Sequence, residues 1–174
     1  RELLLTINEI GLGTAVEFLD TISPQYTADL VTWGAIGART TESQGHRELA
    51  SGMSCPIGFK NGTSGDVKIA VDAIAASMHP HSFLGVTKAG IAGIVTTRGN
   101  EDCHIILRGG KTTNFDAESI TKACALLKKA NLAEVVMVDA SHSNSQKVCR
   151  NQITVTQALA EQIATGSKAI MGIM

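Results

Sequence analysis

The chain is organised around the stretch Cys103-His104-Ile105-Ile106-Leu107-Arg108-Gly109-Gly110-Lys111. Its apolar run, residues 105–107, predicts a short β-strand that is buried on both faces. The run ends at Arg108, and the two glycines that follow allow the backbone to turn sharply. Because burying an unpaired guanidinium group is costly, we expect Arg108 to lie at a strand end and to face a cavity that binds an anion.

The same pattern, an apolar strand followed by a polar residue and a turn of small residues, recurs along the chain. The expected strands are residues 14–20, 34–39, 56–60, 105–107, 135–138 and 169–173. Helical patterns lie around them, at residues 1–10, 23–33, 41–51, 64–78, 116–129 and 147–164. Ser23-Pro24 and Thr41 are expected to begin two of these helices. Residues 81–97 interrupt the alternation and predict an inserted β-hairpin.

Repeated alternation of strands and helices predicts a parallel sheet flanked by helices. An open doubly wound sheet and a (β/α)8 TIM barrel both fit this pattern. No glycine-rich dinucleotide-binding motif follows the first strand, and candidate functional residues follow several strands, which favours the barrel. A barrel needs at least about 200 residues. We therefore expect residues 1–174 to form a single barrel domain that is incomplete at both ends and contains strands 3–8.

The composition excludes several classes of protein. A net charge of -1 and an aromatic content of 3% argue against nucleic-acid binding, which needs a basic surface or stacking residues. No apolar run approaches the roughly 20 residues that cross a bilayer. The four cysteines are too widely spaced for a metal or disulfide motif, which fits reduced thiols in a cytoplasmic protein. They are Cys55, Cys103, Cys124 and Cys149.

Charged side chains gather at the carboxyl ends of the expected strands, which share one edge of a parallel sheet. They are Glu17 with Asp20, Arg39, Lys60, Arg108, and Asp139 with His142. Any one of the three cations could form a surface salt bridge. Three in the same register instead predict a substrate with more than one anionic group, such as a phosphate and a carboxylate. Lys60 could alternatively be a Schiff-base nucleophile.

The sequence allows more than one role for His142 and for Glu17. His142 lies among small polar residues, as either a hydrogen-bonded turn residue or a ligand of a divalent metal. Asp139 could orient its imidazole. Glu17 could position a water molecule or pair with one of the cations.

Four motifs, taken together, resemble the type I 3-deoxy-D-arabino-heptulosonate 7-phosphate (DAHP) synthases of the microbial, feedback-regulated branch. The motifs are GAIGARTTES (34–43), GFKNGT (58–63), ILRGG (106–110) and DASHSNS (139–145). The resemblance implies a (β/α)8 barrel and a metal-dependent transferase. Its reaction would condense phosphoenolpyruvate with erythrose 4-phosphate and water, releasing phosphate, at the first step of the shikimate pathway to aromatic amino acids.

The resemblance also implies roles for individual residues. Phosphoenolpyruvate would be bound by Ala38, Arg39, Lys60 and Arg108. Catalytic roles would fall to Lys60 and Glu17. His142 would bind a divalent metal ion whose other ligands lie outside this chain, so the four cysteines are not expected to supply them. An effector pocket for an aromatic amino acid, beside the hairpin, would be lined by Pro24, Gln25, Ser54 and Phe83.

Three alternatives remain open at this point. A sibling synthase uses arabinose 5-phosphate, although residues 58–63 favour DAHP synthase. A Schiff-base aldolase would use Lys60, and a non-catalytic barrel would only bind an anionic metabolite. For each of the synthases we expect a cytoplasmic homodimer or homotetramer.

Overall fold

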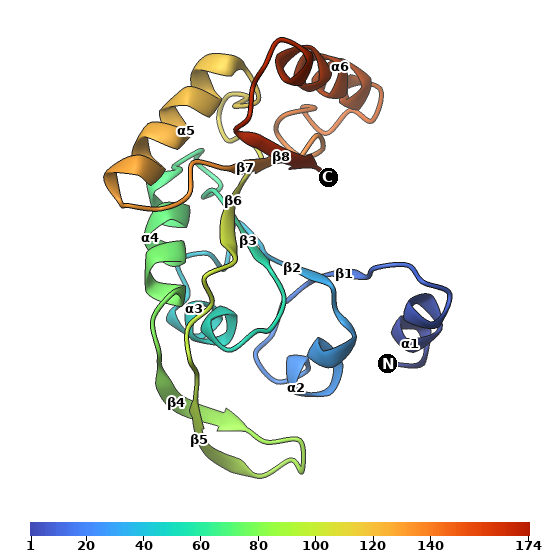
Figure 1. Ribbon diagram of the computed structural model, residues 1–174, viewed down its shortest axis with the longest axis vertical. Coiled ribbons are helices and arrows are strands. Elements are labelled where there is room, and N and C mark those ends of the chain that lie inside the picture. Colours follow the sequence, from blue (N-terminus) through green and yellow to red (C-terminus); the bar gives the residue numbers. More distant parts are fainter. The chain divides into compact units, whose positions relative to one another are not determined.

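The computed structural model describes residues 1–174 as an α/β fold (Figure 1). The helices are α1 (Glu2–Glu9), α2 (Pro24–Thr27), the 3-10 helix η1 (Ala28–Leu30), α3 (Gln44–Ser51), α4 (Lys68–Ser77), α5 (Ala117–Lys129) and α6 (Asn151–Ala164). The strands are β1 (Ala15–Glu17), β2 (Trp33–Ile36), β3 (Ile57–Lys60), β4 (Ser82–Val86), β5 (Ala92–Thr96), β6 (Cys103–Leu107), β7 (Val136–Val138) and β8 (Ile170–Ile173). No helix is both long and apolar enough to cross a bilayer.

Six strands form one sheet in the order β1-β2-β3-β6-β7-β8. The pairs β1–β2, β2–β3, β6–β7 and β7–β8 are parallel. Strands β4 and β5 form a separate antiparallel hairpin between β3 and β6 in the chain. The predicted parallel sheet with an inserted hairpin is therefore confirmed.

The chain divides into two compact units. The first unit comprises Arg1–Phe59 and Ala73–Cys103, and the second comprises Lys60–Asp72 and His104–Met174. The first contains β1, β2, α3 and the hairpin, whereas the second contains β7, β8, α5 and α6.

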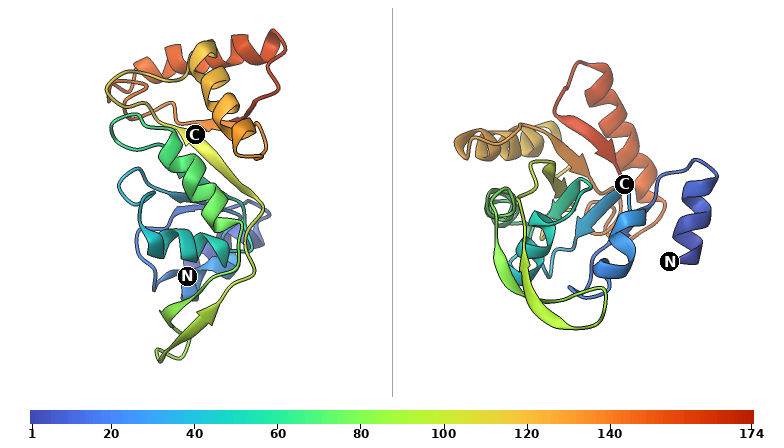
Figure 2. Two further views of the ribbon diagram at one scale, coloured as in Figure 1. Left: turned by 90° about the vertical axis from the view of Figure 1, so that its left-hand side faces the viewer. Right: turned by 60° about the horizontal axis from the view of Figure 1, so that its bottom comes forward.

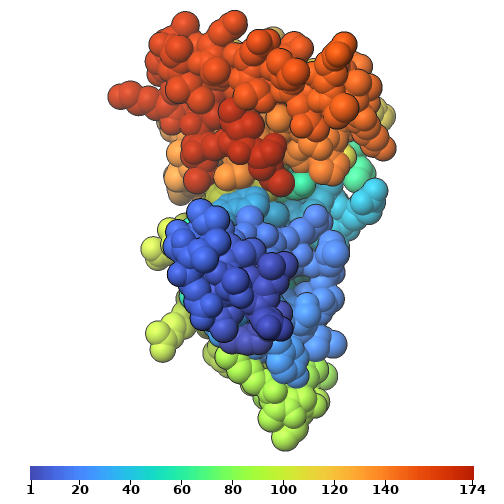
Figure 3. Space-filling model, turned by 90° about the vertical axis from the view of Figure 1, so that its right-hand side faces the viewer, coloured from blue at the N-terminus to red at the C-terminus, as the bar shows by residue number.

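The core of the first unit is built on the inner ends of β2 and β3. Ile36, Ile57 and Phe59 are fully buried there. Gly34 is required because a Cβ at this position would lie 2.4 Å from the ring of Phe18. Helix α1 buries none of its residues and lies on the surface (Figure 3). The buried side chains of the first unit therefore come from elements other than α1, among them β2, β3 and α3.

The hairpin has two different faces because side chains alternate along a strand. Phe83 pairs with Val95 on the partly buried face, and Leu84 pairs with Ile94 on the other. Leu84 and Ile94 are 74% and 73% exposed.

The second unit surrounds the stretch that the sequence singled out. Residues 105–107 are fully buried, as the apolar run predicts. Helix α5 packs against β7 and α6 against β8 (Figure 2). Asp116 caps α5 by accepting a hydrogen bond from the Ser119 amide at 2.9 Å. Helix α5 buries Ile120, Ala123 and Leu127, whereas Cys124 is only partly buried.

The predicted boundaries of two helices in the first unit are partly wrong. The helix expected over residues 23–33 ends as a 3-10 turn at Leu30, because Val31 is extended (φ -104°, ψ 123°) and leads into β2. Helix α3 begins at Gln44 after an extended Ser43, not at Thr41. The Thr41 hydroxyl instead donates to the Gly37 carbonyl at 3.0 Å, which stabilises the preceding turn.

The predicted start of the last helix, α6, is also wrong. The helix expected from residue 147 begins at Asn151. Gln146 and Lys147 have φ values of 54° and 60°, so they form a left-handed turn that a right-handed helix cannot include. Strand β1 is likewise shorter than the expected residues 14–20.

Replacing Gly110 should test how tightly the turn after β6 packs. A Cβ at Gly110 would lie 2.3 Å from the Cα of Gly65, and backbone atoms cannot move aside as a flexible side chain can. We expect Gly110→Ala to lower the free energy of unfolding by about 2–3 kcal/mol. Gly93→Ala is the matched control, since its Cβ would be 3.7 Å from Thr87. Equal urea midpoints for the two variants would contradict this packing.

Candidate functional site

A buried ion pair joins the ends of β3 and β7 in the second unit. Lys60 is the last residue of β3, and Asp139 directly follows β7. The Lys60 Nζ lies 2.9 Å from Oδ2 of Asp139, and the two side chains are only 5% and 1% exposed. The sequence predicted that both residues follow strands, but it did not predict that they pair.

His142 contacts the same carboxylate oxygen. Its Nδ1 lies 2.7 Å from Oδ2 of Asp139, and its side chain is 46% exposed. The other oxygen of Asp139, Oδ1, accepts a hydrogen bond from the Ser141 amide at 2.8 Å. Lys60, Asp139 and His142 thus form a contiguous cluster that opens to solvent at the imidazole.

The imidazole fits the role of one metal ligand, because a metal-binding histidine commonly gives its other ring nitrogen to a carboxylate. Within residues 1–174, however, no three His, Cys, Asp or Glu side chains are grouped so that they could hold a metal ion. His142 can therefore supply one ligand of a site but not the whole of it.

Arg108 has no carboxylate partner of its own. It follows β6 and is 9% exposed. Its guanidinium group forms no salt bridge, and Nη1 donates one long hydrogen bond, 3.4 Å, to the Gly109 carbonyl. Burying a cation without a counter-charge is costly, which is why we expect the Arg108 guanidinium group to face an anion.

A network of asparagine side chains holds the backbone at Arg108, and sequence reasoning missed it. Oδ1 of Asn61 accepts from the Arg108 amide at 2.9 Å and from Nδ2 of Asn114 at 3.1 Å. Oδ1 of Asn114 accepts from the Gly109 amide at 2.7 Å. The turn that carries the Arg108 guanidinium is therefore fixed by one side chain from the loop after β3 and one from farther along its own loop.

Asn144 links this network to the ion pair. Its Nδ2 donates to the carbonyls of Leu107 and Asp139 at 3.1 and 3.0 Å, and its Oδ1 accepts from the Asn114 amide at 2.9 Å. Asn61 and Asn144 belong to polar turns that follow strands, and this position in the sequence could have identified them as site residues. Asn114 had none, because it lies six residues beyond Arg108 in an unpatterned loop.

In the first unit, Glu17 lies over the turn that carries Ala38 and Arg39. A Cβ on Gly37 would be 2.2 Å from Oε1 of Glu17, so a larger residue at position 37 would require the Glu17 side chain to move. The amides of Thr40 and Thr41 both donate to the Gly37 carbonyl at 3.0 Å, which closes the turn. Arg39 is exposed and forms no salt bridge.

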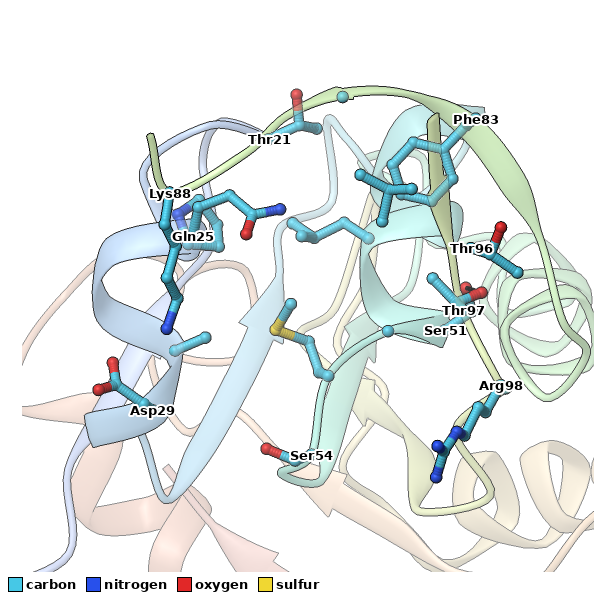
Figure 4. Close-up of a pocket in the computed structure, with 18 residues that line it drawn as sticks. Thr21, Gln25, Asp29, Ser51, Ser54, Phe83, Lys88, Thr96, Thr97 and Arg98 are labelled. Carbon is cyan, nitrogen blue, oxygen red and sulfur yellow. Dashed lines mark hydrogen bonds between the residues drawn. The ribbon is translucent and has the colours of Figure 1, made fainter. Parts of the chain in front are cut away.

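The first unit also contains a cavity of about 490 Å³. The four residues expected at an effector pocket, which come from three separate segments, all line it: Pro24, Gln25, Ser54 and Phe83. Figure 4 shows Gln25 reaching toward the interior, with Lys88 and Asp29 on one side and Arg98 on the other. Leu49, Met53 and Val95 add apolar surface.

The surroundings of Cys55, Cys103 and His46, all in the first unit, do not suggest metal ligands. Burial raises the pKa of the Cys103 thiol to about 12, with a further contribution from Asp102, and burial also raises the pKa of Cys55. Both thiols are therefore neutral and unreactive. The ring nitrogens of His46 contact the Ser43 hydroxyl at 2.8 Å and the Leu19 carbonyl at 3.1 Å.

Removing the Asn114 amide should destabilise the turn at Arg108. Asn114→Ala leaves the Gly109 amide without its acceptor, and we expect the free energy of unfolding to fall by about 1–3 kcal/mol. Gln157→Ala, which removes an exposed amide from α6, should change it by less than about 0.5 kcal/mol. Thermal and urea unfolding measure both variants, and an Asn114→Ala protein as stable as the control would show that the network contributes little.

Comparison with known proteins places these features in a family. Residues 3–174 match the profile described as "DAHP synthetase I family". The Phe-sensitive phospho-2-dehydro-3-deoxyheptonate aldolase of Escherichia coli K12 is 59% identical over the whole chain, which covers 50% of that protein. The tyrosine-inhibited enzyme of Schizosaccharomyces pombe is 54% identical, again over the whole chain and 47% of the relative.

A solved structure agrees with these sequence matches. The phospho-2-dehydro-3-deoxyheptonate aldolase from Francisella tularensis SCHU S4 matches with a TM-score of 0.98 and 53% identity, over 100% of this chain and 51% of that one. The chain thus spans about half the length of the relatives it matches. Because the family profile covers nearly every residue, the chain belongs to the DAHP synthetase I family.

Proposed function

We propose that the protein carrying this chain condenses phosphoenolpyruvate with erythrose 4-phosphate and water to give DAHP and phosphate. The six parallel strands would be strands 3–8 of a (β/α)8 barrel. Support comes from the family match and from relatives named phospho-2-dehydro-3-deoxyheptonate aldolase at 54–59% identity. The chain covers about half of those relatives, so the remaining strands and ligands would come from the rest of such a protein.

The buried, unpaired guanidinium of Arg108 is the observation that carries this proposal. Phosphoenolpyruvate has a phosphate and a carboxylate, and a guanidinium group binds either in a bidentate manner. Lys60 would add a second cation, with Asp139 holding its ammonium group. Arg39 and the backbone of Ala38 would complete the substrate-binding set.

The ion pair also bears on the Schiff-base alternative. A lysine that forms an imine attacks as a neutral amine in an apolar pocket or beside other cations. Lys60 is instead paired with a buried carboxylate, an arrangement that suits an ammonium group binding an anion. The geometry therefore favours substrate binding over imine formation.

In the proposed reaction, the cations fix phosphoenolpyruvate so that its C3 faces the aldehyde carbon of the second substrate. C3 forms the new C–C bond, water adds at C2, and phosphate leaves by cleavage of its C–O bond. Glu17 would take the proton from the attacking water, and the aldehyde oxygen, which gains the electron pair of its C=O π bond, would take up a proton to become a hydroxyl group of the product. A divalent metal ion, with His142 as one of its ligands, would supply Lewis-acid polarisation of the aldehyde oxygen.

The cavity beside the hairpin is proposed to bind an aromatic amino acid that regulates the enzyme. Its lining combines the Phe83 ring and other apolar side chains with charges of both signs, which suits an aromatic zwitterion. Asp29 could meet the ammonium group, although Arg1 already binds it in a bidentate manner. The names of the relatives, Phe-sensitive and tyrosine-inhibited, support amino-acid regulation in this family.

Arg108→Ala tests the proposed activity. Losing charge-assisted hydrogen bonds to the substrate should lower kcat/KM for phosphoenolpyruvate by about 100-fold or more. Arg108→Lys should recover only part of this loss, because lysine lacks the bidentate fork. Arg150→Ala, which removes an exposed arginine from the same unit, serves as control. Steady-state kinetics with erythrose 4-phosphate, and separately with arabinose 5-phosphate, identify the second substrate.

Two results would overturn this proposal. Unchanged kinetics in Arg108→Ala would remove Arg108 from the substrate site. A protein that binds phosphoenolpyruvate but turns over neither aldose phosphate would be a non-catalytic binding barrel.

Phe83→Ala tests the regulatory site. Deleting the ring should raise the concentration of aromatic amino acid needed for half inhibition by at least about 10-fold, since an aromatic contact contributes about 1.5 kcal/mol or more. Leu84→Ala is the control, because it changes the exposed face of the same strand. Inhibition by phenylalanine, tyrosine and tryptophan is measured against each variant's own uninhibited rate. Equal sensitivity in the two variants would exclude this cavity as the regulatory site.

A further inference from the structure

One oxygen atom connects the two chemical parts of the proposed active site. Oδ2 of Asp139 lies 2.9 Å from Nζ of Lys60 and 2.7 Å from Nδ1 of His142. Lys60 belongs to the proposed substrate-binding set, and His142 is the proposed metal ligand. Asp139 itself is neither in the proposed substrate-binding set nor a proposed metal ligand.

The carboxylate that makes both contacts is held rigidly. Its second oxygen accepts from the Ser141 amide at 2.8 Å. The backbone amide of Asp139 donates to the Leu107 carbonyl at 2.9 Å, and its carbonyl accepts from Asn144 at 3.0 Å. Asp139 is 1% exposed, so water does not compete for these contacts.

The contact to His142 selects one tautomer of the imidazole. A carboxylate only accepts hydrogen bonds, so Nδ1 must carry the hydrogen that lies between the two groups. Nε2 then keeps its lone pair and forms no hydrogen bond within the protein, which leaves it as the nitrogen able to bind a metal ion. His142 also has an uncommon φ of 49°, so the ring is oriented by both its backbone and Asp139.

We propose that Asp139 is a positioning residue that orients Lys60 and His142 through a single carboxylate oxygen. This inference rests on the function proposed above. Asparagine cannot replace Asp139, because the carboxylate uses both oxygens to accept from three donors and an amide has only one accepting oxygen. At least one of the three contacts is lost in any amide orientation.

The test compares Asp139→Asn with Asp72→Asn in the intact protein. Asp72 pairs with Lys68 at 2.6 Å, but both side chains are largely exposed, so the control removes the same charge from a solvated pair. We expect Asp139→Asn to weaken Mn²⁺ binding by about 10–100-fold, the usual effect of losing a partner of a metal ligand. Its KM for phosphoenolpyruvate should also rise, whereas Asp72→Asn should bind both as the wild type does.

A double-mutant cycle separates positioning from a general loss of structure. If Asp139 acts through His142, Asp139→Asn should have no further effect on Mn²⁺ binding in a His142→Ala background. An equal loss in both backgrounds overturns the proposal. Should Asp139→Asn fold poorly because it breaks the buried Lys60–Asp139 ion pair, the Lys60→Gln/Asp139→Asn variant removes both charges of that pair. It should bind Mn²⁺ about 10–100-fold more weakly than Lys60→Gln alone.

A measurement without any substitution tests the tautomer directly. In metal-free wild-type protein, ¹⁵N NMR should show the hydrogen of the His142 ring on Nδ1 and a lone pair on Nε2. A hydrogen on Nε2 instead overturns the proposal. If Asp139→Asn matches a catalytically active wild type in Mn²⁺ affinity, only this inference fails. A wild-type protein with neither Mn²⁺ binding nor turnover overturns the proposed function together with the inference.

Discussion

The second unit depends on the buried ion pair between Lys60 and Asp139. Each partner of a buried ion pair needs the other. Removing one partner lowers the free energy of unfolding by about 3–5 kcal/mol, whereas replacing both partners with apolar residues lowers it far less. The pair can form only if β3 and β7 end at the same level, so it ties the register of two distant strands to a chemical requirement. The asparagine network then fixes the loops that follow these strands. Packing and site geometry are thus specified by the same few polar groups.

Within this unit, two buried cations are treated differently. Lys60 has a carboxylate within hydrogen-bonding distance, whereas the Arg108 guanidinium has only a long contact to a carbonyl. Stability alone would favour pairing both. The asparagine side chains hold the backbone at Arg108 although its guanidinium group has no counter-charge, which is consistent with the anion-binding role proposed for it. This contrast between the two cations is the physical basis for proposing a binding site at Arg108.

The sequence predicted the parallel strands, the hairpin and the Asp116 helix start, because each has a local cause in periodicity or capping. It failed where a later residue overrides a local preference. Val31 has an extended backbone that leads into β2, so the preceding helix ends earlier than predicted. Gln146 and Lys147 have left-handed backbone conformations, so α6 begins later than predicted. For the site, the residue types at strand ends were readable. The sequence did not predict that Lys60 and His142 contact the same oxygen of Asp139, or that Asn114 holds the turn at Arg108. Both arrangements depend on how separate loops pack against one another.

Neighbouring residues of the hairpin have different environments because they lie on opposite faces. Phe83 lines the cavity, while its neighbour Leu84 faces solvent, and the tight turn that joins Thr87 to Gly90 and Ile91 fixes which strand residues are paired. A strand repeats every two residues, so losing one residue from β4 or β5 would exchange its two faces. A change in length is therefore expected to be tolerated in the turn and not in the strands, whereas a substitution on the inner face would alter the lining of the cavity and keep the pairing.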